Sequence, residues 1–294
     1  MKELTEEELR NVIEGEFPEM PITSFRFVNA GWNNYIVVVN EGIIFRIPKI
    51  AGNAANLRSE ILLTSRLQKC PYSIPNYRYI SRGSLFFGGY PIIHGDFLSN
   101  SHSYGEDLLR DFKVFLSYLR SVSPDSLEGT DIKVYDPESW KKKELSLLNR
   151  FQKSLMNLIP VDYFTKIEDQ WEKVSSGLGE YDISLIHGDL YRNNVIISEN
   201  HRNLVGVIDW SESVFGDVAL DYAALGIDFQ WSFTSKLLMA EKKEHMDEQI
   251  KRINFYRNID PLYYAHYMAK MGRSKEAERY CQMAIESWRK IRWI

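Results

Sequence analysis

A short polar segment and the two apolar runs that follow it constrain the fold of this chain more than any other feature. The segment His187–Asn194 has the spacing H-x-D-x-x-x-x-N, and residues 195–198 and 204–208 predict two short strands around a polar turn. The second strand leads into Asp209, fifteen positions beyond Asn194. A hairpin of these strands would bring Asn194 and Asp209 together at one end.

The groups in this segment are those that phosphoryl transfer requires of a protein. Asp189 is the candidate catalytic residue that orients an attacking hydroxyl group and removes its proton late in the reaction. Asn194 and Asp209 are candidate ligands of Mg²⁺, because this ion prefers oxygen donors and is shared with nucleotide phosphates. We expect His187 to support the loop by hydrogen bonding.

The first ninety residues have the pattern of a small sheet with one packed helix. Thr5 and Glu8 form a possible capping box, which predicts a short helix at the N-terminus. Strands are predicted at residues 35–39, 43–47, 77–81 and 85–87, and a further helix at residues 54–67. The pair Gly88-Gly89 predicts a break in the chain.

After Gly95 the pattern becomes largely helical. Helices are predicted at residues 107–122, 140–158 and 163–175, and from residue 219 onward. The expected fold class is α+β with two lobes. We expect a β-rich N-terminal nucleotide-binding lobe at residues 1–90, a hinge at residues 91–96 and a larger, mainly α-helical lobe at residues 97–294.

Composition limits the classes of function. The formal net charge of −4 argues against nucleic-acid and membrane-surface partners. The two cysteines, Cys70 and Cys281, are far apart and lack metal-ligand spacing, so a reducing cytoplasm is the expected location. The N-terminus lacks the apolar core of a signal peptide, and no apolar run has the length of a membrane span. The sequence therefore predicts a soluble cytoplasmic protein of unknown oligomeric state.

The string H-G-D-L-Y-R-N-N with I-D-W resembles the aminoglycoside phosphotransferase family, a branch of the protein-kinase-like fold. The resemblance extends over most of the chain, and Asn29–Tyr35 sits where the family has its nucleotide-covering loop. The strings F-R-I-P-K at Phe45–Lys49 and G-Y-P-I-I-H-G at Gly89–Gly95 are most similar to the 2''-aminoglycoside phosphotransferase branch. The resemblance implies transfer of a nucleotide γ-phosphate to a hydroxyl, the 2''-hydroxyl for this branch, of an aminoglycoside antibiotic, which confers resistance.

By the same resemblance, a basic strand residue binds the nucleotide phosphates, and a helix glutamate is the ion-pair partner of this residue. Two cations compete for this role, Arg46 within the strand and Lys49 after Pro48. Lysine is a compact charge commonly used on phosphates, whereas arginine would bind them as a fork. The resemblance favours Lys49, with Glu60 as its ion-pair partner.

The hinge residues suggest how the nucleotide base is bound. If Tyr90 lies at the back of the base pocket, Pro91 offers only a carbonyl and Ile93 offers an amide. The 2'' branch includes members that prefer GTP, a preference associated with a large tyrosine at this position. Tyr90 therefore favours GTP over ATP as the donor.

Acidic residues after the metal aspartate are candidates for the acceptor site, because aminoglycosides are polycations. These carboxylates are Glu212, Asp228, Glu241 and Glu244, with Trp231 as a possible platform for a sugar ring. Asp217 and Asp221 resemble the family segment G-D-x-x-x-D. We expect both to be structural, one capping a helix and the other bonded to the catalytic loop.

Other functions remain open. The fold and the catalytic loop are equally compatible with a kinase of another hydroxyl compound, such as a macrolide, an amino alcohol or a sugar. A protein kinase is disfavoured because the chain has no D-F-G or A-P-E string and no long activation segment. A non-catalytic nucleotide-binding module is the alternative from another class, although Asp189, Asn194 and Asp209 are all present.

Overall fold

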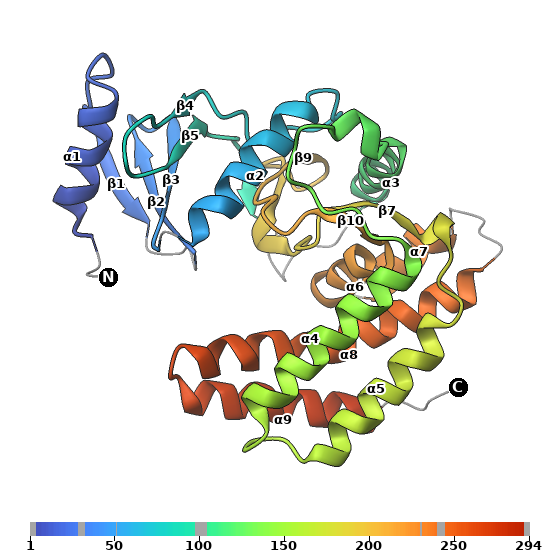
Figure 1. The fold of residues 1–294 in the computed structure, drawn as a ribbon. Helices are drawn as coiled ribbons and strands as arrows, with labels where there is room; N and C mark the ends of the chain where they lie inside the picture. The colour runs from blue at the N-terminus through green and yellow to red at the C-terminus, as the bar shows by residue number, and fades with distance from the viewer. Residues whose placement is uncertain are drawn as a thin grey trace. The chain divides into compact units, whose positions relative to one another are not determined.

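A computed structural model describes residues 4–28, 33–50, 52–97, 105–229, 231–239 and 245–290 (Figure 1). The chain forms two compact units, one comprising Met1–Ile132 and Arg192–Ser213 and the other Lys133–Tyr191 and Val214–Ile294. Both contain strands and helices, which confirms the predicted α+β class. The lobe and hinge boundaries expected at residues 1–90, 91–96 and 97–294 stay predictions. They describe functional lobes, whereas the two compact units are defined by how densely their residues pack.

The first unit is built on a five-stranded antiparallel sheet of order β1-β2-β3-β5-β4. Its strands are β1 (Phe25–Val28), β2 (Asn34–Val39), β3 (Ile43–Pro48), β4 (Tyr79–Ile80) and β5 (Gly88–Pro91). The predicted hairpin is confirmed, since β2 and β3 pair from Asn34 opposite Pro48 to Val39 opposite Ile43. Positive φ angles at Asn40 and Glu41 make the tight turn between these strands.

The strand expected at residues 85–87 and the break expected at Gly88-Gly89 are wrong. Both glycines lie inside β5, where Gly89 pairs with Phe45. A Cβ atom on Gly89 would lie 2.6 Å from the Phe45 ring, and one on Gly88 would lie 2.9 Å from the Tyr77 ring. Glycine is needed here because aromatic rings pack directly on the strand backbone.

Two helices cover this sheet, α1 (Glu6–Glu16) and α2 (Asn53–Arg66). The capping box predicted at Thr5 is confirmed at the start of α1. Leu9 and Ile13 of α1 belong to the same buried cluster as Phe45, whereas Glu60 of α2 contacts Arg46. Because consecutive strand residues point to opposite faces, α1 and α2 lie on opposite sides of the sheet (Figure 1).

The rest of the first unit is a second, smaller sheet and its neighbouring helices, and the residue Asn194 directly precedes one of its strands. β6 (Asp96–Phe97), β8 (Val195–Ile197) and β9 (Leu204–Val207) form a three-stranded antiparallel sheet, preceded by the 3-10 helix η3 (Arg192–Asn194). The predicted hairpin of β8 and β9 is therefore confirmed. α3 (Glu106–Ser121) and the 3-10 helix η1 (Pro124–Leu127) pack nearby, and Asp111 of α3 accepts a hydrogen bond from the Leu204 amide at 3.0 Å.

The second unit is mainly helical. Its helices are α4 (Pro137–Leu155), α5 (Val161–Ser175), α6 (Ala219–Asp228), α7 (Trp231–Met239), α8 (Met246–Lys270) and α9 (Ser274–Lys290), together with the 3-10 helix η2 (Glu180–Asp182). α4, α5, α8 and α9 lie side by side (Figure 1). The strands β7 (Ile183–Ile186) and β10 (Val214–Asp217) pair antiparallel in this unit. The segment that begins with His187 follows β7, and α6 follows β10.

Within the described ranges, none of the helices combines the length and the apolar character needed to cross a membrane.

Candidate functional site

The loop that carries Asp189 is fixed from both sides in the second unit. It begins where β7 ends, and Asp221 of α6 accepts hydrogen bonds from the backbone amides of His187 at 2.8 Å and Gly188 at 2.9 Å. The Asp189 amide donates to Nδ1 of His187 at 3.3 Å. His187 and Asp221 thus make the supporting hydrogen bonds that the sequence predicted. The backbone of Asp189 is held in place before any substrate arrives.

Asp217 has a structural role in the same unit. Its Oδ1 atom accepts a hydrogen bond from the Ala219 amide at the start of α6 (3.0 Å), and Oδ2 lies 2.8 Å from Nε of Arg252. Arg252 also lies 2.8 Å from Asp182, and all three side chains are buried. Burial raises the pKa of Asp217, and Arg252 opposes this rise. The buried charges therefore connect Arg252 of α8 to Asp217, which accepts the first amide of α6, so the structural role predicted for Asp217 is observed.

Asn194 and Asp209 flank the β8–β9 hairpin in the first unit. The Ile208 amide donates to the Asn194 carbonyl at 2.9 Å, and Val195 pairs with Val207, so the two candidate metal ligands lie at the same end of the hairpin. Asn194 is 3% exposed. Asp209 has a φ of 63°, in the left-handed region that costs a non-glycine residue about 1 kcal/mol. The hairpin thus holds a strained backbone at the residue expected to bind metal.

The donor set at this end fits Mg²⁺. Asn194 offers a neutral amide oxygen and Asp209 a carboxylate, and Oδ1 of Asp209 also accepts a hydrogen bond from the Ser211 hydroxyl at 3.0 Å. In the part of the chain that the structure describes, no group of three or more His, Cys, Asp or Glu side chains forms a complete protein cage for a metal ion. Mg²⁺ needs no such cage, because it keeps several waters and shares its coordination with substrate phosphates.

Arg46 is the ion-pair partner of Glu60. Its Nη1 atom lies 2.7 Å from both carboxylate oxygens of Glu60, and its Nη2 atom lies 2.8 Å from Oδ1 of Asp209. This corrects the expectation that Lys49 would pair with Glu60. Strand alternation directs Arg46 toward α2, whereas Lys49 follows the end of β3 and its Nζ atom lies 5.5 Å from the centroid of the Tyr35 ring.

Glu60 is fully buried between this arginine and a tyrosine. The Tyr77 hydroxyl donates to Oε1 of Glu60 at 2.9 Å. Burial raises the pKa of Glu60 to about 7, while Arg46 and the hydrogen bond from Tyr77 lower it. The guanidinium of Arg46 is itself only 5% exposed, and its two carboxylate neighbours raise its pKa against the effect of burial. Arg46 therefore keeps its charge inside the protein.

The expected hinge residues continue the same sheet. Tyr90 is 2% exposed, pairs with Ile44 and makes an edge-on contact with Tyr77, with ring centroids 5.0 Å apart. The Ile92 amide donates to the Gly42 carbonyl at 2.9 Å and is committed to the sheet. The base-binding roles expected for Tyr90, Pro91 and Ile93 stay predictions.

The expected acceptor residues are distributed over both units. Asp228 ends α6 in the second unit, whereas Glu212 is exposed in the first unit. The Arg257 guanidinium lies over the Trp231 ring at 5.0 Å, and the role of Trp231 as a platform for a sugar stays a prediction, as do the roles of Glu212 and Asp228. Glu241 and Glu244 lie outside the described residues.

Three residues of the second unit that the sequence did not indicate interact with each other and, through their charges, with Asp189 and Asp228. They are Tyr191, Asp260 and Tyr264. The Tyr191 hydroxyl donates to Asp260 of α8. Burial raises the pKa of Asp260 to about 6, the hydrogen bond from Tyr191 lowers it, and Asp228 raises it. Burial also raises the pKa of Tyr264, as do the charges of Asp260, Asp189 and Asp228. The one sequence signal was Pro261 directly after Asp260, since proline inside a helix marks an irregular position.

Comparison with known proteins agrees with this geometry. The model of the phosphotransferase enzyme family matches residues 24–254. The uncharacterized protein YcbJ of Bacillus subtilis (strain 168) is 25% identical over 188 residues, which cover 62% of this chain and 58% of that protein. The match thus spans less than two thirds of the relative's length.

Two solved structures have a similar fold over nearly the whole chain. The GDP and kanamycin complex of APH(2")-IIia superposes with a TM-score of 0.84 at 21% identity, covering 96% of this chain and 98% of the other. Macrolide 2'-phosphotransferase type I gives a TM-score of 0.74 at 19% identity, with 97% and 99% covered. At these identities the similarity establishes a kinase-like fold. The family match over most of the chain establishes more, and the chain belongs to the phosphotransferase enzyme family.

Proposed function

We propose that this chain is a magnesium-dependent kinase that transfers the γ-phosphate of a nucleoside triphosphate to a hydroxyl group of an aminoglycoside, at the 2'' position. The observation that carries the proposal is the fixed loop: Asp221 and His187 hold the backbone around Asp189 by hydrogen bonds at 2.8 to 3.3 Å. Such preorganisation is what phosphoryl transfer requires, because its catalysis consists mainly of positioning and charge stabilisation.

Each residue has a distinct role in this proposal. The Asp189 carboxylate accepts a hydrogen bond from the acceptor hydroxyl, directs its oxygen at the γ-phosphorus and takes up the proton. Asn194 and Asp209 would hold Mg²⁺, which neutralises charge on the phosphate oxygens when bound. Arg46 is the better candidate for the phosphate-binding cation, because Glu60 and Asp209 already orient its guanidinium.

The donor proposed here is GTP, with ATP as the alternative. Tyr90 supports GTP because its large ring is buried in β5 where the resemblance predicts the back of the base pocket. The APH(2")-IIia structure holds GDP together with kanamycin. A strong preference for ATP in turnover would remove the argument from Tyr90.

The acceptor is proposed from the charge of the second unit. Asp189, Asp228 and Asp260 all act on the pKa of Tyr264, so three carboxylates lie within electrostatic reach of one side chain. Such a region attracts a polycation. A macrolide is the second candidate, because macrolide 2'-phosphotransferase type I has a similar fold.

Phosphate transfer to a panel of acceptors tests the proposal. We expect the purified chain with Mg²⁺ and GTP to phosphorylate kanamycin, detected by the mass of the product and by release of GDP. The same assay with ATP, with a macrolide and with an amino alcohol ranks donors and acceptors. Asp189→Ala should abolish most turnover while nucleotide affinity stays nearly unchanged. Asp169→Ala is the matched control, because Asp169 is an exposed aspartate of α5 in the same unit.

Two results would contradict the proposal. Undiminished activity in Asp189→Ala would remove the assigned base. Nucleotide binding without transfer to any acceptor of the panel would favour a non-catalytic nucleotide-binding module.

A further inference from the structure

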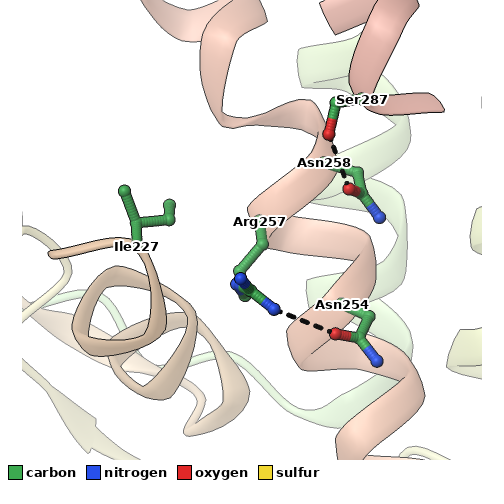
Figure 2. Close-up of a pocket in the computed structure, with 5 residues that line it drawn as sticks. All are labelled: Ile227, Asn254, Arg257, Asn258 and Ser287. Carbon is green, nitrogen blue, oxygen red and sulfur yellow. Dashed lines mark hydrogen bonds between the residues drawn. The ribbon is translucent and has the colours of Figure 1, made fainter. Parts of the chain in front are cut away.

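A polar pocket of about 450 Å³ lies within the second unit. It is lined by Ile227 of α6, by Asn254, Arg257 and Asn258 of α8 and by Ser287 of α9 (Figure 2). None of these residues belongs to the loop of Asp189 or has a role in the proposed phosphoryl transfer.

Two hydrogen bonds hold the polar side chains of the pocket. Arg257 donates from Nη1 to Oδ1 of Asn254 at 3.3 Å, and the Ser287 hydroxyl donates to Oδ1 of Asn258 at 2.9 Å (Figure 2). Because arginine has no acceptor, Asn254 must present its oxygen to Arg257 and keeps its NH₂ group for another partner. The bond to Asn254 orients the guanidinium of Arg257, which supplies the charged N–H donors of the pocket.

The charge of Arg257 is not neutralised by the protein. Across the described ranges, no carboxylate forms an ion pair with Arg257, and its Nε atom is buried without a hydrogen-bond partner. Burial accordingly lowers the pKa of Arg257. Arg257 is partly buried, and a cation that is withdrawn from water without an ion-pair partner is the kind that an anion completes.

The position of Arg257 is fixed from two sides. Its guanidinium lies over the Trp231 ring at 5.0 Å, and its Cδ atom lies where a Cβ on Gly226 would approach to 3.2 Å. The absence of a side chain at Gly226 thus lets Arg257 lie close against α6. A guanidinium held in this way loses little rotational freedom when a ligand binds.

We propose that this pocket binds a small organic monocarboxylate. The two carboxylate oxygens accept hydrogen bonds from the guanidinium of Arg257, which Asn254 orients, and the apolar part of the ligand contacts Ile227. The planar guanidinium matches the two oxygens of a carboxylate.

The surrounding charges select a single negative charge. Arg257 is the one charged side chain among the residues that line the pocket. Its single positive charge balances one negative charge of a ligand and leaves a second one uncompensated. A phosphate dianion is therefore disfavoured relative to a carboxylate.

Isothermal titration calorimetry with butyrate tests the site, at pH 7.5 and constant ionic strength, with chloride as the balancing anion. We expect saturable binding by the unmodified chain and an affinity at least tenfold lower in Arg257→Gln. Arg279→Gln should bind as the unmodified chain does, because Arg279 is exposed on α9 and its loss removes the same charge. Asn254→Ala, which leaves the arginine in place, should weaken binding several-fold and serves if Arg257→Gln does not fold.

Three outcomes would overturn the proposal. The first is that butyrate shows no saturable binding at concentrations up to about 100 μM, which is about 100 times a Kd of 1 μM. The others are equal affinity of Arg257→Gln for butyrate and tighter binding of inorganic phosphate than of butyrate. The test is independent of the proposed kinase activity, because it uses neither nucleotide nor acceptor. Asp189→Ala, which should be inactive in transfer, is expected to bind butyrate with unchanged affinity.

Discussion

The Nη2 atom of Arg46 lies 2.8 Å from Oδ1 of Asp209, while Nη1 of the same guanidinium lies 2.7 Å from both oxygens of Glu60. One buried cation thus serves two carboxylates from distant parts of the chain. With all three groups ionised, the trio carries one surplus negative charge. This surplus favours a bound cation beside Asp209, in agreement with the proposed role of Asp209 as a Mg²⁺ ligand.

The roles of the two candidate cations can be separated by substitution. We expect Arg46→Met to raise the KM for nucleotide at least tenfold, because it removes the oriented guanidinium, whereas Lys49→Met should change it less than threefold. Nucleotide titration of each variant measures the effect. A larger loss in Lys49→Met would return the phosphate-binding role to Lys49.

Arg46 is also expected to stabilise the first unit. Removing it leaves Glu60 buried without its cation, and breaking such a pair costs about 3 kcal/mol or more. Denaturant unfolding should therefore show a clear loss for Arg46→Met. The double variant Arg46→Met with Glu60→Gln should recover part of that loss, since no unpaired charge is then buried. Equal stability of the single and double variants would contradict the electrostatic explanation.

Asp260 should make stability depend on pH. Its pKa is raised from an ordinary value of 3.8 to about 6, so the folded chain holds a proton between these values that the unfolded chain has lost. The contribution is largest at low pH and is lost as the pH rises through 6. Between pH 5 and pH 7 the free energy of unfolding should fall by about 1 kcal/mol on this account.

The control for that prediction is Asp260→Asn, which should reduce the slope of stability against pH in this window. In the kinase assay, affinity for a cationic acceptor should fall below pH 6 in the unmodified chain as Asp260 is neutralised. An unchanged slope in Asp260→Asn would show that other groups cause the dependence.

Asp221 is expected to act on the reaction by positioning. Asp221→Asn replaces one acceptor oxygen with an NH₂ group, which would face the amide of His187 or Gly188. We expect kcat to fall by about 100-fold, or about 2.7 kcal/mol, with nearly unchanged nucleotide affinity. Steady-state kinetics with a separate nucleotide titration distinguishes this from general unfolding, which would weaken both.

Gly89 should tolerate no side chain. In Gly89→Ala the added methyl group would lie 2.6 Å from the Phe45 ring, and overpacking of this kind costs about 1 to 3 kcal/mol. Phe45→Leu in the same chain should relieve part of the cost. Gly15→Ala is the matched control, because a Cβ there meets nothing within 4 Å, and thermal unfolding should show no loss for it.

Features that depend on neighbouring residues were predictable from the sequence, and features that depend on distant contacts were not. The capping box at Thr5 and the hairpins of β2–β3 and β8–β9 follow from local patterns, and all were predicted. Glycine at position 89 was misinterpreted as a break, because its neighbour Phe45 lies 44 positions earlier.

The candidate site shows the same division. The motif residues Asp189, Asn194 and Asp209 are candidates from their spacing alone, and their roles stay predictions. The choice of Arg46 as partner of Glu60 depends on which face of β3 meets α2, and the contact of Asp260 with Tyr191 spans 69 positions. The periodicity of apolar residues in a single sequence predicts neither the contact of Arg46 with Glu60 nor that of Asp260 with Tyr191.

Helix α6 connects the loop of the proposed base to a candidate acceptor residue. Asp221 in its first turn anchors the loop of the proposed base, and Asp228 ends the same helix seven residues later. At a rise of 1.5 Å per residue, these carboxylates are about 10 Å apart along the helix axis. Because Asp221 holds the loop of Asp189 by its backbone amides, a change in the length or register of α6 would move the proposed base relative to Asp228.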